Sequence, residues 1–257
     1  MSLKQVDFRG HYACGIRYGG SLSNSGNLGA LPAQGERKGM MGKSSLWSIQ
    51  SWNTLLAFTV MTLGALFPIA NPLGAVPFFY SLTAEDSPKF RLIQARKTAL
   101  NVTGVLIVSF LVGKLILSFL GISLGVLRIA GGLIVAQTAW EMVNAHPRLT
   151  TQEHHEAIDK DDISFTPMAI PMISGPGAIG VAIGLSTRTH QWIDQLGCMT
   201  GILLLGLLIY LFLVLGESLI EKFGATGMGA FNRILGFLIL AIAVQLISDG
   251  VLELLKA

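Results

Sequence analysis

Charged residues are scarce in this chain of 257 residues: they make up 13% of it, whereas hydrophobic residues make up 51%. A typical soluble domain carries about a quarter charged residues, so the composition excludes an ordinary soluble domain and indicates a membrane protein. The formal net charge of +3 is small and the basic residues are scattered, so nothing indicates a nucleic-acid partner. The partner that the composition indicates is the lipid bilayer.

Residues that could hold a metal or carry out catalysis are also few. Cys14 and Cys198 lie far apart, at no spacing that a metal site or redox pair requires. His154 and His155 lie in an acidic stretch without a cysteine or a spaced third ligand, so we expect a solvated loop there. No nucleophile, base and orienting group converge, and no apolar stretch holds an obvious proton relay. We therefore expect no metal, no cofactor and no enzyme activity.

A sustained apolar pattern is missing from residues 1–46, where Gly, Ser, Asn and basic residues dominate. Such a stretch cannot bury a core, and we expect a disordered polar arm. It is a tail without a role, or the result of a start assigned too early, with Met40 or Met41 as natural starts. The alternative is a basic arm that faces lipid. The basic residues of such an arm are Arg37, Lys38 and Lys43.

What the chain does have is six apolar blocks, each near the roughly 20 residues that a membrane helix requires. The expected spans are residues 52–82, 98–120, 123–143, 165–185, 196–215 and 228–254. A polar, basic connection at 83–97 follows the first span. The expected organisation is a first three-helix repeat at 47–147, a hydrophilic connecting loop at 148–164 and a second three-helix repeat at 165–257.

The first span is interrupted by Pro68, Pro72 and Pro77, with Gly74 among them. Each proline removes a backbone donor and disturbs the carbonyl four residues earlier, so the helix should break here. Asn71 before Pro72 is typical of a helix that restarts, with an Asn N-cap and Pro in the first helical position. Within a bilayer, freed backbone groups are tolerated only where protein or water covers them.

The fourth span repeats this interruption at an offset of 103 residues, from Pro68 to Pro171. At that offset Ser174 matches Asn71 and Gly177 matches Gly74. Three spans in each half reverse the direction in which the second half enters the membrane. We therefore predict an all-α polytopic membrane protein of two inverted three-helix repeats, the architecture of many secondary transporters.

The two breaks are the strongest candidate for a binding site. A single break is also explained as a kink for packing, but matching breaks in two inverted halves favour a site near the midplane. A restarting helix offers N–H groups and a positive dipole end to an anion, and neither break holds an acidic residue. The candidate substrate-binding residues are Asn71, Pro72, Gly74, Ser174, Gly175 and Gly177.

Arg128 and Arg233 lie near the starts of the third and sixth spans. An arginine within a bilayer is costly and is usually paired, so one interpretation is a pair of structural ion pairs, with Glu141 or Asp249 as partners. The other interpretation is that each arginine reaches the interface near a helix end. Direct contact with the substrate is the role that the pattern favours least.

The basic residues favour one orientation of the spans. Leaving out the arm, seven lie on one side of the membrane and two on the other: Lys89, Arg91, Arg96, Lys97, Arg148, Lys160 and Lys222 against Arg188 and Lys256. The positive-inside rule then places the richer side in the cytoplasm and both termini outside. The basic residues of the arm favour the opposite orientation.

Four motifs resemble the MarC family of membrane proteins. They are PIANPLGAVPF from Pro68, RIAGG from Arg128, PMAIPMISGPGAI from Pro167, and NRILG from Asn232 continuing through Gln245 to Gly250. The likeness covers about residues 50–255 and leaves out the arm, which departs from the family's usual short N-terminus. It implies a six-span protein of the bacterial inner membrane, with a site at the broken first and fourth spans. Some members are described as transporters of small neutral amino acids.

The resulting hypothesis is a secondary transporter for a small zwitterionic solute such as glycine or alanine. The coupling ion, proton or sodium, stays open, and an oligomer is compatible with these features. A passive channel for small solutes would share the two breaks, and a scaffold that transports nothing would use them as kinks. Saturable exchange separates the transporter from both alternatives.

Overall fold

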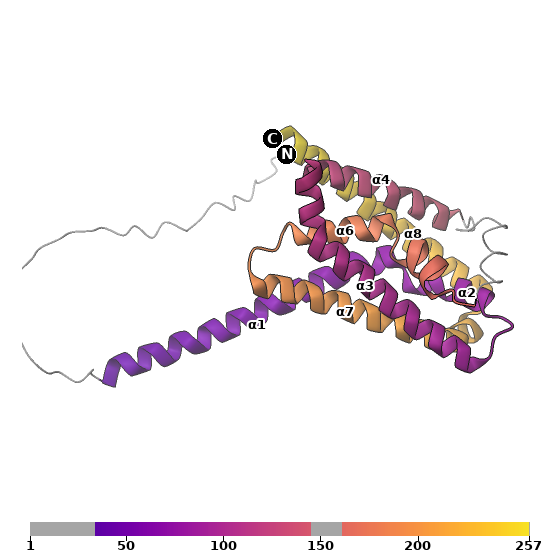
Figure 1. Ribbon diagram of the computed structural model, residues 1–257, viewed down its shortest axis with the longest axis horizontal. Coiled ribbons are helices and arrows are strands. Elements are labelled where there is room, and N and C mark those ends of the chain that lie inside the picture. The colour runs from indigo at the N-terminus through magenta and orange to yellow at the C-terminus, as the bar shows by residue number, and fades with distance from the viewer. Residues whose placement is uncertain (1–33, 145–160, 257) are drawn as a thin grey trace, which may run out of the picture. The chain divides into compact units, whose positions relative to one another are not determined.

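The computed structural model describes residues 34–144 and 161–256, and every element in these two ranges is helical. The chain divides into two units, Met1–Ser44 and Ser45–Ala257, of which the second holds the helices that concern us. In chain order the elements are α1 (Gln34–Ala70), α2 (Pro72–Leu82), α3 (Pro88–Leu120), α4 (Leu124–Val143), η1 (Ser164–Ile173), α6 (Pro176–Ser186), α7 (Trp192–Val214) and α8 (Gly216–Lys256) (Figure 1).

The helices supply five candidate spans, or six if one bent pair is counted, against the six expected. Five stretches are long and apolar enough to cross a membrane: Ser51–Ala70, Pro88–Leu120, Leu124–Val143, Trp192–Val214 and Thr226–Lys256. Counting η1 and α6, which meet at a bend of 69°, as one broken span brings the number of candidate spans to six. The prediction of an all-α polytopic membrane protein is confirmed.

Several boundaries differ from those expected. The connection at 83–97 is mostly helix, since α3 begins at Pro88, where the Ser87 hydroxyl accepts a hydrogen bond from the N–H of Phe90 at 3.3 Å. Ser followed by Pro is a strong helix start, and apolar periodicity alone does not detect it. α1 begins at Gln34, within the stretch expected to be a disordered arm. Residues 1–33 of that arm, and residues 148–160 of the connecting loop with both histidines, lie outside the described residues.

Both predicted breaks are present. Asn71 separates α1 from α2, and Ser174 and Gly175 separate η1 from α6. The segment η1 is itself irregular, because Thr166 and Ile170 have extended backbones. Both residues precede a proline, whose ring disfavours the helical conformation of the residue before it.

The two halves of the chain pack by exchanging their restart helices. α2 packs against α7 and α8 of the second half, and α6 packs against α3 and α4 of the first. The contacts repeat in kind: a Cβ at Gly113 would meet Ile183 of α6, and a Cβ at Gly216 would meet Tyr80 of α2. This reciprocity supports the inverted-repeat prediction, which stays a prediction.

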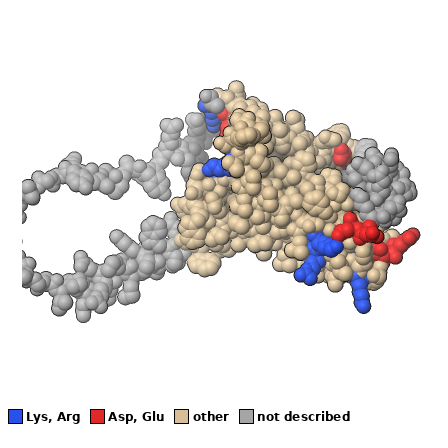
Figure 2. Space-filling view, viewed as in Figure 1, with Lys and Arg blue, Asp and Glu red and all other residues tan. Residues whose placement is uncertain are grey.

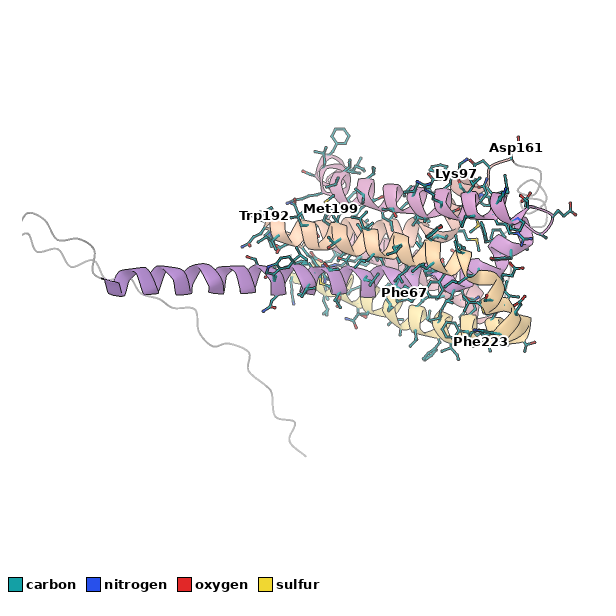
Figure 3. All side chains as sticks on the ribbon, turned by 90° about the horizontal axis from the view of Figure 1, so that it is seen from below. Phe67, Lys97, Asp161, Trp192, Met199 and Phe223 are labelled. Carbon is teal, nitrogen blue, oxygen red and sulfur yellow. The ribbon has the colours of Figure 1, made fainter. Side chains whose placement is uncertain are left out.

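Apolar side chains cover the outer faces of the helices, as a lipid-facing surface requires. Among the most exposed are Phe119 at 87% and Leu115 at 70%. Figure 2 shows charged atoms gathered toward two ends of the view, with uncharged surface between them. Figure 3, turned by 90° about the horizontal axis, shows Lys97 and Asp161 at one of these ends and Trp192 toward the other.

An ion pair joins α3 to the residues just before η1. The Lys97 ammonium lies 2.6 Å from the Asp162 carboxylate, which also accepts a hydrogen bond from the N–H of Ser164. The pKa of Asp162 is lowered from 3.8 to about 2, first by the hydrogen bond from Lys97, then by one from the Ser164 side chain, and less by the bond from the Ser164 N–H.

Because the pKa of Asp162 is lowered on folding, its contribution to stability is present above pH 3.8 and is lost as the pH falls toward 2. The pair is about half exposed, so the loss should be at most about 1 kcal/mol. We expect Asp162→Asn to flatten this part of the curve of unfolding midpoint against pH, measured in detergent by tryptophan fluorescence. Parallel curves for the two proteins between pH 4 and pH 2 would contradict the assignment.

Candidate functional site

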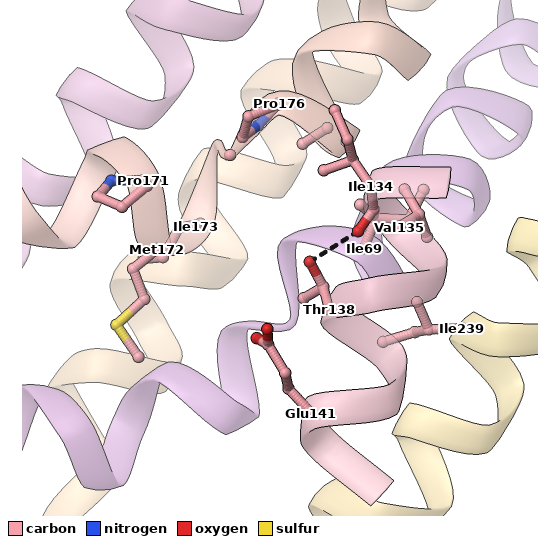
Figure 4. Close-up of a pocket in the computed structure, with 13 residues that line it drawn as sticks. Ile69, Ile134, Val135, Thr138, Glu141, Pro171, Met172, Ile173, Pro176 and Ile239 are labelled. Carbon is pink, nitrogen blue, oxygen red and sulfur yellow. Dashed lines mark hydrogen bonds between the residues drawn. The ribbon is translucent and has the colours of Figure 1, made fainter. Parts of the chain in front are cut away.

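The second break opens into a cavity of about 170 Å³. Its walls come from α1, α4, η1, α6 and α8, so both halves of the chain contribute (Figure 4). Most of the lining is apolar, including Ile69, Val135 and Ile239. The cavity therefore lies where a broken helix meets the last helix of each half.

The first turn of α6 forms one wall of this cavity. Gly175, Pro176, Gly177 and Ala178 all line it. The N–H groups of a first helical turn have no acceptor within the helix, and the N-cap residue Gly175 has no side chain to bind them. Two of the candidate residues, Gly175 and Gly177, are thus placed at a helix start that faces the cavity.

The start of α2 is arranged differently, because Asn71 closes it. The Asn71 side-chain oxygen accepts from the N–H of Gly74 at 3.0 Å, and its amide donates to Asn232 Oδ1 at 2.9 Å. Asn71 is 1% exposed and has a left-handed backbone with φ 44°. Asn71, Pro72 and Gly74 are not among the residues that line the cavity.

Ser174 is likewise turned away from the cavity. Its hydroxyl donates to the carbonyl of Ala169 at 2.8 Å, and the residue is fully buried. The structure therefore brings together two of the six candidate residues at the cavity, and the other four stabilise the breaks. Sequence matching treated the two breaks as equals, but their cap residues, Asn71 and Gly175, give them different roles.

Another wall comes from α4 and carries the polar side chains. Glu141 and Thr138 line the cavity one turn apart (Figure 4). The Thr138 hydroxyl donates to the carbonyl of Ile134 at 3.0 Å, and the amide of Gln137 donates to Glu141 Oε1 at 3.2 Å. Glu141 is the one ionisable residue among those that line the cavity. The sequence suggests Glu141 only as an ion-pair partner, although its place among apolar residues near a span end marks it as a candidate site residue.

The expected ion pairs take a different form. Arg128 pairs with Glu253 at 2.5 Å, which joins α4 to α8, and pairs with neither Glu141 nor Asp249. Asp249 accepts from the amide of Gln245 at 2.7 Å, one turn earlier on α8. Arg233 is exposed and forms no ion pair with any residue that the structure describes. Partners 125 positions apart, such as Arg128 and Glu253, cannot be chosen from sequence spacing.

Within the described residues, no group of three or more His, Cys, Asp or Glu side chains could hold a metal ion. Cys198 is a buried free cysteine of α7. The chemistry available at the cavity is therefore that of a helix start, a carboxylate and a hydroxyl set in an apolar wall.

Comparison with known proteins identifies the family to which these features belong. Residues 56–255 match the profile described as MarC family integral membrane protein. A UPF0056 membrane protein of Methanocaldococcus jannaschii is 31% identical over 84% of this chain and 96% of its own length. The UPF0056 membrane proteins YvbG of Bacillus subtilis and YhcE of Escherichia coli are 33% and 31% identical, over 76% and 72% of this chain and 95% and 88% of their own lengths.

No solved structure matches the chain. The profile match covers both breaks and runs from within α1 to the last turn of α8. The chain is a multi-pass integral membrane protein, and it belongs to the MarC family.

Proposed function

We propose that this protein is a secondary transporter of small zwitterionic solutes, of the glycine or alanine type, in the bacterial inner membrane. The observation that carries the proposal is the cavity of about 170 Å³, which has a helix start on one side and a carboxylate on the other. Relatives from Escherichia coli and Bacillus subtilis support the bacterial membrane.

The size of the cavity favours a very small solute. Sites for drug-sized ligands are typically about 300–1,000 Å³, well above the volume found here. The inner edge is tight as well: a Cβ at Gly177 would lie 2.5 Å from the nearest methyl of Val135 and 3.6 Å from Ile69. A cavity of this volume favours an amino acid with a hydrogen or methyl side chain over a longer one.

The polarity of the two walls suits a zwitterion. The first turn of α6 attracts a carboxylate through its N–H groups and the positive end of the helix dipole. Glu141 on α4 offers an acceptor to an ammonium group, and hydrogen bonds between charged partners are stronger than neutral ones. Glu141 is also the residue at which a proton or sodium ion would bind, which makes it the first candidate for ion coupling.

The test is exchange of radiolabelled glycine and alanine in proteoliposomes, with Glu141→Gln beside the wild type. The substitution keeps the shape of the side chain and removes its charge. A hydrogen bond to a charged group contributes about 1.5–3 kcal/mol, so the half-saturating glycine concentration should rise about tenfold or more. Asp249→Asn is the matched control. Like Glu141, Asp249 accepts a hydrogen bond from a glutamine one turn earlier on its helix, in this case Gln245, but it does not line the cavity.

Three outcomes contradict the proposal in different ways. Absence of wild-type exchange under both proton and sodium gradients would rule out this class of cargo. Flux that does not saturate and shows no counter-transport would indicate the passive channel. Equal effects of Glu141→Gln and Asp249→Asn would remove the cavity from the mechanism.

A further inference from the structure

A second, smaller cavity of about 100 Å³ lies between α1, α4, α6 and α8. These four helices also contribute to the first cavity, together with η1. Two arginines line the second cavity, Arg128 of α4 and Arg188, which follows α6. The first cavity is lined by an acidic residue, Glu141, and by no arginine that the structure describes.

The order of the lining residues places the two cavities at successive levels along the helices. On α6 the first turn lines the first cavity, and Gly180 to Leu185 line the second. On α4 the order is reversed, with Leu127 to Gly131 in the second cavity and residues from Ile134 to Glu141 in the first.

The other two helices, α1 and α8, also line the two cavities at different levels. On α1, Ala65 lines the second cavity and Ile69, one turn later, lines the first. On α8, Ile239 lines the first and Leu246, two turns later, lines the second. All four helices therefore pass from one cavity to the other.

A layer of close contacts separates the cavities. The closest approaches to Gly177 come from Val135 of α4 and Ile69 of α1. One turn away, α4 and α8 approach so closely that a Cβ at Gly132 would lie 3.0 Å from the carbonyl of Ala243. Leu66 and Ala243 are fully buried. This layer closes the space between the four helices in the conformation described.

The two arginines place positive charge at the second cavity, although Arg128 also faces Asp249 and Glu253 in a neighbouring pocket and Glu253 offsets part of its charge. One Arg128 nitrogen is used by Glu253, but a guanidinium has five N–H donors in a planar fork, so others are available for a carboxylate. Arg188 is exposed beyond the end of α6. Its charge lies at the mouth of the cavity, away from the layer of close contacts.

We propose that the two cavities are the two ends of one solute path between α1, α4, α6 and α8, and that Arg128 and Arg188 form a second site, which binds the solute's carboxylate on the far side of the closed layer. This inference rests on the proposed function and deepens it. The solute passes from the site at Glu141 to the site at the arginines when the layer opens.

The first test fills the second cavity. A Cβ at Gly184, which lines this cavity, would meet nothing within 4 Å, so Gly184→Leu fits without a clash at Cβ. Leucine is also the better helix former. We expect the protein to fold and glycine exchange to be lost. Gly104→Leu is the matched control, because Gly104 is an exposed helical residue of α3 with equally open space at Cβ.

The outcomes separate the two proposals. Wild-type exchange that survives in Gly184→Leu would overturn the path and leave the transporter standing. Absence of wild-type exchange would overturn the transporter and the path together. Loss of exchange in both Gly104→Leu and Gly184→Leu would show that a leucine disturbs the fold in general. A blocked path would then not explain the loss of exchange.

A second test reads the arginine site without transport. In a Cys14→Ser background, where the remaining Cys198 is buried, the variant Gly184→Cys is treated with an anionic sulfonate and a cationic trimethylammonium thiol reagent. We expect the anionic reagent to react faster, and Arg188→Gln to reduce its advantage. Equal rates for the two reagents, or no reaction at the introduced thiol while the protein is folded, would overturn the arginine site.

Discussion

Replacing Asn71 by valine should destabilise the protein by about 2–3 kcal/mol, through loss of the helix cap and strain in the backbone. Asn71 has φ 44°, a left-handed conformation that asparagine tolerates and that a β-branched residue strongly resists. Its side chain caps α2 and binds Asn232 of α8. Valine replaces none of these bonds.

Asn71→Gly is the matched comparison, because glycine adopts the left-handed conformation freely. It should lose only the side-chain bonds, about 1 kcal/mol. The measurement is the midpoint of thermal unfolding in detergent, followed by the fluorescence of the 4 tryptophans. If valine and glycine lowered the midpoint equally, the backbone of Asn71 would not be strained.

Gly201→Leu should have the larger effect, a loss of about 3 kcal/mol or more from overpacking between α1 and α7. A Cβ at Gly201 would lie 2.7 Å from Thr62 Cβ and 2.9 Å from the carbonyl of Thr59. With Gly197 four residues earlier, it forms a small-residue face that lets the two helices approach closely. The same contact holds the hydrogen bond between the hydroxyls of Thr59 and Thr200, at 2.7 Å.

The control for Gly201→Leu is Gly64→Leu on α1, where a Cβ would meet nothing within 4 Å. We expect the control to be recovered as folded protein in normal yield. Gly201→Leu should be recovered in low yield, with a lowered unfolding midpoint. Similar yields and midpoints for the two variants would show that α1 and α7 can separate without loss of stability.

The spans and both breaks could be predicted from the sequence because they depend on local properties. Apolar length marks a span, and proline interrupts a helix wherever it occurs. The start of α3 at Pro88 was missed because the cap at Ser87 precedes the apolar block by several turns. Periodicity detects only the apolar part of a helix, and the helix itself can extend beyond that part.

The site could be predicted only in part, because side-chain direction at a break depends on distant residues. The Asn71 amide is bound by Asn232, 161 positions away, while its oxygen caps α2. Both ends of the side chain are therefore occupied within the protein. Gly175 has no side chain that could close α6, so its break stays open to the cavity. The same pattern of prolines thus produces one closed helix start and one open start.

The exchange of restart helices between the halves has a consequence for synthesis on the ribosome. When α2 enters the membrane, its packing partners α7 and α8 do not yet exist. At about 5–20 residues per second, the 161 residues between Asn71 and Asn232 take roughly 10–30 seconds to translate. Until Asn232 is made, the Asn71 amide has only its second acceptor, Met142 Sδ at 3.6 Å. α6 emerges when α3 and α4 are already in place, so the first half serves as the template on which the second half assembles.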